Sequence, residues 1–168
     1  MSESLIVPPP SARLHLLSKI RVVLDQDWHK AVGDAASVTI EDFCLIYKAE
    51  ALYPPTGKGE LVRDYIALNF NWLAGWQVAL DWAKQQGLEN TAPREAFAVG
   101  NQCPNLNHIL GKHQTYLVAT TCCTFVGKQQ ACCVYWTGTM HEPILRPTDS
   151  FKFCGSWFLF RKPSVLVA

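Results

Sequence analysis

"ELVRDYIALNFNWLAGWQVALDWAKQQG", residues 60–87, carries the strongest helical signal in the chain. At about 100° per residue its apolar side chains share one broad face, whereas Arg63, Gln77, Asp81 and Lys84 lie opposite. Gly87 is the residue type that most often ends a helix. The stretch therefore predicts one long helix whose buried face consists of Leu61, Tyr65, Leu68, Trp72, Trp76, Ala79, Leu80 and Ala83.

Asn69 falls near the middle of this apolar face. A buried amide without partners costs about 1 to 3 kcal/mol, so Asn69 must bond to the backbone, to a buried water or to a bound ligand. Tyr65, Trp72 and Trp76 lie beside it on the predicted helix. These four residues are the candidate lining of a small-molecule pocket.

Two further helices are predicted upstream, after a proline-rich tail at residues 1–10. Residues 11–32 have apolar side chains at helical spacing, with Ser11 as a possible N-cap and Gly33 as the stop. Residues 40–52 follow Thr39, which with Asp42 forms a loose capping box, and end before Pro54. The first half of the chain therefore reads as three helices.

The periodicity changes from residue 96 onward. Residues 96–99 predict a short strand and residues 103–111 a short helix, while residues 115–126, 129–138 and 150–162 are rich in β-branched and aromatic residues. Residues 139–149 contain two prolines and predict irregular structure. We expect a single α+β domain over residues 11–168, with three N-terminal helices packed on a C-terminal antiparallel meander of about three to five strands.

The stretch "CCTFVGKQQACC", residues 122–133, sets two cysteine pairs about a predicted turn at Gly127 and Lys128. This register places the cysteines opposite one another in pairs, one pair on each face of the hairpin: Cys122 with Cys133 and Cys123 with Cys132. Packing on a sheet covered on both sides is the favoured interpretation. The alternatives are a zinc site completed by Cys154 or His141 and labile cross-strand disulfides.

Cys103 precedes Pro104, and a cysteine at the N-cap of the predicted helix would be favoured as a thiolate. His108 and His113 follow nearby, so Cys103 with either histidine is a weak candidate for nucleophilic catalysis. His141 in the predicted loop is a weak acid-base candidate. No complete catalytic motif is present, and the sequence leaves open whether the protein is an enzyme.

The 168 residues carry a net charge of +1, which argues against strong binding to nucleic acid or to a membrane surface. The charge is uneven, because residues 1–95 hold 9 basic and 12 acidic side chains, and residues 96–168 hold 6 and 2. No signal peptide or membrane-spanning stretch is evident, so we expect a cytoplasmic location, reduced thiols and no membrane partner. No cofactor motif is found, and no cofactor is expected.

Three hypotheses for function follow. The first is a soluble binding module that engages a protein partner, or nucleic acid through the basic C-terminal half. The second is a pocket protein or enzyme, because the predicted order of elements resembles that of the cone-shaped NTF2-like class, in which a pocket lies between helices and sheet. The third is a thiol redox or zinc-binding protein.

Overall fold

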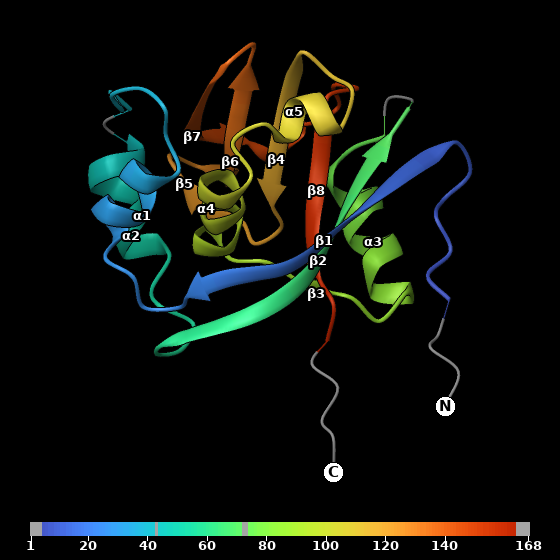
Figure 1. Ribbon diagram of the computed structural model, residues 1–168, viewed down its shortest axis with the longest axis horizontal. Coiled ribbons are helices and arrows are strands. Elements are labelled where there is room, and N and C mark those ends of the chain that lie inside the picture. Colours follow the sequence, from blue (N-terminus) through green and yellow to red (C-terminus); the bar gives the residue numbers. More distant parts are fainter. Residues whose placement is uncertain (1–4, 43, 72–73, 164–168) are drawn as a thin grey trace.

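The computed structural model describes residues 5–42, 44–71 and 74–163, and within these ranges the chain forms a large mixed sheet with helices on both faces (Figure 1). The strands are β1 (Ala12–Val23), β2 (Glu60–Phe70), β3 (Glu89–Asn90), β4 (Gln114–Ala119), β5 (Cys123–Phe125), β6 (Lys128–Thr137), β7 (Met140–Pro147) and β8 (Ser156–Arg161). The helices are α1 (Trp28–Asp34), a π-helical turn (Cys44–Lys48), α2 (Ala49–Leu52), α3 (Trp76–Gln85), α4 (Pro93–Gln102), α5 (Leu106–Ile109) and a 3-10 turn (Thr148–Ser150).

The order of strands across the sheet is β1-β2-β8-β4-β6-β5, with β3 paired to β8 and β7 paired to β6. Strands β4 and β8 run parallel and all other pairs are antiparallel. The fold is α+β, but the expected three helices followed by an antiparallel meander are wrong. Helices and strands alternate along the chain instead, and the first long element is a strand.

The predicted long helix is in fact β2 followed by α3. Strand β2 lies between β1 and β8, and from Tyr65 to Phe70 it is buried on both faces. A strand buried on both faces shows a continuous apolar run rather than alternation, which resembles the pattern of a buried helix. Among the described residues of this segment, only α3 is helical.

The first predicted helix fails for a different reason. Residues 12–23 form β1, and its pairing with β2 shifts register between Leu17 and Ile20, where Lys19 has a φ of 57°. A bulge of this kind inserts an extra residue and changes the phase of the strand. The buried residues Leu17 and Ile20 therefore stand three apart, which is a helical spacing in a strand.

Two predictions in the C-terminal half are also wrong. Residues 96–99 belong to α4, whose first turn holds Pro93 and Glu95. Residues 140–147 form β7, which contains Pro143 and Pro147. Among the described strands β7 pairs only with β6, so prolines on its other edge remove no hydrogen bond of the sheet. The short helix within residues 103–111 and the strands β4, β6 and β8 agree with the sequence patterns.

The cysteine hairpin is shifted by two residues from the predicted register. Cys123 pairs with Gln130 and Phe125 with Lys128, so the turn residues are Val126 and Gly127. Their φ angles of 52° and 72° are both positive, as a type I′ turn requires. The cysteines still alternate between faces, since Cys123 and Cys132 pack in one core and Cys122 and Cys133 in the other.

The two cores lie on opposite faces of the sheet (Figure 1). The face covered by α1, α4 and α5, here called the inner face, buries Trp28, Phe97 and Trp136. The outer face is covered by α3 and buries Trp76, Phe158 and other aromatic side chains. The longest helices in the described ranges, α3 and α4, have ten residues each, which is too short to cross a bilayer.

Val126→Asn tests the observed turn. A β-branched residue at positive φ is strained, whereas Asn adopts this conformation readily, and the 80% exposed Val126 side chain contributes little packing. We expect the free energy of unfolding to rise by about 1 kcal/mol in urea titration. Val38→Asn, at an exposed valine without positive φ, is the matched control. An equal effect of the two substitutions would contradict the turn assignment.

Candidate functional site

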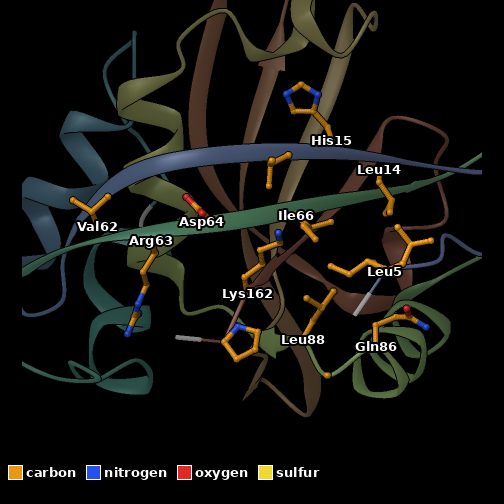
Figure 2. Close-up of a pocket in the computed structure, with 14 residues that line it drawn as sticks. Leu5, Leu14, His15, Val62, Arg63, Asp64, Ile66, Gln86, Leu88 and Lys162 are labelled. Atoms are coloured by element: carbon orange, nitrogen blue, oxygen red, sulfur yellow. The ribbon is translucent and has the colours of Figure 1, made fainter. Parts of the chain in front are cut away.

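A groove of about 1050 Å³ lies on the outer face of the sheet beyond the end of α3 (Figure 2). Its floor consists of side chains from β1, β2 and the residue after β8, and its walls come from Leu5, Ile6 and the turn after α3. We call it the outer groove and define it by Leu14, Leu16, Val62, Asp64, Ile66, Leu88 and Lys162.

The outer groove exists because α3 is too short to cover the whole face. Trp82 near the end of α3 contacts the ring of Phe160 at 6.1 Å between centroids, and Gly87 with a φ of 72° then turns the chain into β3. Among the described residues, no helix lies over the sheet surface beyond this point. Leu16 and Val62 remain 52% and 59% exposed on neighbouring strands.

Charged groups of both signs lie between Val62 and the other apolar residues of the groove (Figure 2). The backbone N–H of Lys162, directly after β8, donates to the carbonyl of Asp64 on the adjacent strand β2 at 3.1 Å, so the two residues are neighbours. The Oδ1 atom of Asp64 accepts the backbone N–H of Lys19 at the bulge, at 2.9 Å. Figure 2 shows Leu14, Ile66 and Leu88 on one side of Lys162, with Asp64 and Val62 on the other.

A buried ionic cluster occupies the inner face at the level of the outer groove. Glu95 is 1% exposed, and its Oε1 accepts from Arg63 Nη1 at 3.0 Å, Tyr65 Oη at 2.9 Å and Arg161 Nη1 at 2.9 Å. Its Oε2 accepts the backbone N–H of Ala92 at 2.7 Å. We call Arg63, Tyr65, Glu89, Glu95 and Arg161 the Glu95 cluster; Glu89 belongs to it through Arg161 Nε at 2.7 Å.

Both oxygens of Glu95 are occupied, so the carboxylate is held by its donors rather than left free to accept a proton from a substrate. The cluster joins β2, β8 and the start of α4. Burial and the adjacent Glu95 charge raise the pKa of Tyr65 above its ordinary value, so the phenol stays a donor. These contacts support a structural role for the Glu95 cluster, which holds β2, β8 and α4 together.

Glu95→Gln tests this role. The substitution leaves two arginines without their shared anion, and we expect a loss of about 3 to 5 kcal/mol in the free energy of unfolding. Tyr65→Phe removes only one donor to a charged acceptor, and a smaller loss of about 1.5 to 3 kcal/mol is expected. Urea titration of both variants provides the measurement. A Glu95→Gln protein as stable as wild type would refute the structural role.

The three pocket candidates that the structure describes do not share one cavity. Tyr65 belongs to the Glu95 cluster on the inner face, and Trp76 packs against Phe158 on the outer face, with centroids 6.4 Å apart. The buried Asn69 donates from Nδ2 to the carbonyls of Cys154 at 2.7 Å and Ser156 at 3.0 Å. Trp72 lies outside the described residues.

The residues proposed for catalysis are placed differently from the prediction. Cys103 ends α4 instead of beginning α5, whose N-cap is Asn105, and burial raises the pKa of its thiol. The N-cap thiolate prediction is therefore wrong. His108 and His113 are exposed. His141 is buried within β7, where Nδ1 lies 2.9 Å from the carbonyl of Ala35 and the ring stacks on Trp136.

The cysteines are free thiols and are not gathered at one point. Cys132 and Cys133 are buried on opposite faces, whereas Cys154 is exposed. The observed register makes Cys123 and Cys132 diagonal neighbours, for which Cα atoms lie about 7 to 8 Å apart, beyond the usual disulfide range. Within residues 5–42, 44–71 and 74–163, no three His, Cys, Asp or Glu side chains are grouped to hold a metal ion.

Buried thiols and phenols predict loss of stability at alkaline pH. Burial raises the pKa values of Cys132, Cys133, Tyr53 and Tyr65, so these groups keep their protons in the folded protein. The unfolded chain loses them from about pH 9 upward, so the free energy of unfolding falls as pH rises, by up to about 1.4 kcal/mol per unit and group.

Urea titrations between pH 7 and 11 measure this slope. Cys133→Ala is expected to make it shallower, whereas Cys154→Ala, at an exposed thiol, is expected to leave it unchanged. A slope that does not differ between these two variants would contradict the assignment of the loss to buried groups.

Sequence reasoning missed the Glu95 cluster and the outer groove. The combination of Pro93 and Glu95 is a helix-start signal that was available, but residues 96–99 had been interpreted as a strand. No local sequence pattern indicates the outer groove, because the strands that form its floor lie far apart in the sequence.

No protein-family model, curated protein or solved structure matches this chain. The two faces of the sheet and the chemistry of their side chains therefore provide the indications of function.

Proposed function

We propose that this protein is a binding module that holds a segment of a protein partner in the outer groove. The observation that carries the proposal is the exposure of two apolar side chains in the outer groove, Leu16 on β1 and Val62 on β2, where no helix of the described residues covers the sheet. Exposed apolar side chains interspersed with charged groups are a usual composition of a protein interface.

The shape and charge of the outer groove favour a protein segment over the other partners. The groove is open, whereas small-molecule sites enclose most of the ligand surface. Asp64 and Lys162 supply both signs of charge among its apolar side chains, which suits a peptide better than a polyanion. The nucleic-acid alternative gains less support, because Arg161 from the basic half is committed to Glu89 and Glu95.

Selection of a displayed library of random peptides on the whole protein tests the proposal. Selected peptides are expected to carry apolar residues and to shift the backbone amide resonances of residues 14–16 and 62–66. Leu16→Asp and Val62→Asp each replace an exposed apolar side chain of the groove by a charge and are expected to weaken binding at least tenfold, or about 1.4 kcal/mol.

Val78→Asp is the matched control, since Val78 is 45% exposed on α3 and does not line the outer groove. Its binding is expected to equal that of wild type. A variant that ends at Pro163 lacks the last five residues of the chain. Peptide binding by this variant therefore cannot be altered by those residues competing for the groove. Peptides that bind Leu16→Asp and Val78→Asp equally well, or a library that yields no binder, would contradict the proposal.

A further inference from the structure

A second, smaller hollow of about 250 Å³ lies on the inner face, on the other side of the sheet from the outer groove. It is bounded by the end of β1, the chain after α2 and the first turn of α4. We call it the α4 pocket and define it by Leu24, Leu52, Pro54, Pro93, Arg94 and Arg161. Most of its surface is apolar, and its charged groups gather at α4.

Arg94 is a buried cation in this pocket, with only 8% of the residue exposed. Its Nε donates to the carbonyl of Gln26 and its Nη1 to that of Tyr53, both at 2.9 Å, and the guanidinium lies over the ring of Trp28. Within the described ranges no carboxylate lies within 4 Å of it. Buried charges are normally paired, so this cation lacks the anion expected beside it.

Acidic groups near Arg94 do not fill that role. Asp25, Asp27 and Glu50 act on it from a greater distance and do not line the α4 pocket. Asp25 accepts the backbone N–H of Gly59, and Asp27 caps α1 by accepting that of Lys30. The carboxylate that does line the pocket, Glu95, already accepts four hydrogen bonds.

The remaining surroundings add positive potential. The first residues of the ten-residue helix α4 line the pocket, and the N-terminus of a helix carries partial positive charge. Arg161 is adjacent to the same space.

We propose that the α4 pocket binds a small organic carboxylate. Its carboxylate pairs with the Arg94 guanidinium, which still has donors that bond to no described group, and its apolar part contacts Leu24, Leu52 and Pro54. The apolar share of the lining favours an organic acid over inorganic phosphate, and the volume limits it to a small molecule. Because both oxygens of Glu95 are occupied, the pocket binds its ligand without acting on it.

Amide chemical shifts of the full-length protein, titrated with butanoate, test the inference. Butanamide, a neutral molecule of the same shape, and inorganic phosphate are the comparison probes. Butanoate is expected to produce saturable shifts at residues 52–56 and 90–95, with both comparison probes binding at least tenfold more weakly. Equal affinity for butanamide, tighter binding of phosphate, shifts confined to the outer groove or no saturable shift would each overturn the proposal.

Substitutions provide a second line of evidence. Arg94→Gln removes the cation, but Arg94 also ties two loops together, so this variant reports on folding as well as on binding. Leu52→Asp avoids this difficulty, because Leu52 is 39% exposed at the rim and the new carboxylate opposes the ligand's charge. We expect Leu52→Asp to weaken butanoate binding at least tenfold and Val78→Asp to leave it unchanged; equal binding by the two would overturn the assignment.

Discussion

The carboxylate of Glu95 is the constraint on which the rest of the structure depends. It is buried, and a buried anion is tolerated only where donors surround it. Its donors come from β2, β8 and the backbone at the start of α4, so one side chain fixes the position of that helix on the inner face. Because Arg94 and much of the α4 pocket belong to the start of α4, Glu95 also fixes their positions.

The same strands present two different surfaces. On β2, Tyr65 faces the Glu95 cluster while the flanking Asp64 and Ile66 line the outer groove, because successive side chains of a strand alternate between faces. On β8 the same alternation directs Arg161 inward, and the next residue, Lys162, lies at the outer groove. The inner face carries the buried Glu95 cluster and the smaller α4 pocket, whereas the outer face carries the larger open groove, so the two faces suit ligands of different kinds.

Sequence patterns predicted the helices and strands correctly only where local residue preferences determine them. Strands β4, β6 and β8 were evident from their β-branched and aromatic residues, and α3 from its amphipathic spacing. Strand β2 was misread because burial on both faces removes the alternation. The bulge at Lys19 places the buried residues Leu17 and Ile20 three positions apart, which is a helical spacing. The turn was predicted one residue too late because the observed turn needs a positive φ at Val126, a conformation that valine rarely adopts. Each error arises where tertiary pairing overrides local preference.

The candidate sites were less predictable than the fold, because they depend on contacts between distant segments. Pro93 and Glu95 announce a helix start, but nothing local indicates that Arg63 and Arg161 converge on that carboxylate. Likewise, the exposure of Leu16 and Val62 follows from where α3 ends. Cysteines and histidines are the candidate groups that the sequence indicates, whereas the charged groups gathered in the structure are mainly arginines and carboxylates.

A double-mutant cycle between Arg63→Met and Arg161→Met tests the central claim most directly, since both arginines donate to the same oxygen of Glu95. If that shared carboxylate holds β2, β8 and α4 together, the two substitutions are coupled, with an interaction energy of roughly 1 kcal/mol or more in the free energy of unfolding. Effects that add to within about 0.3 kcal/mol would show that the two arginines act independently and would contradict the account.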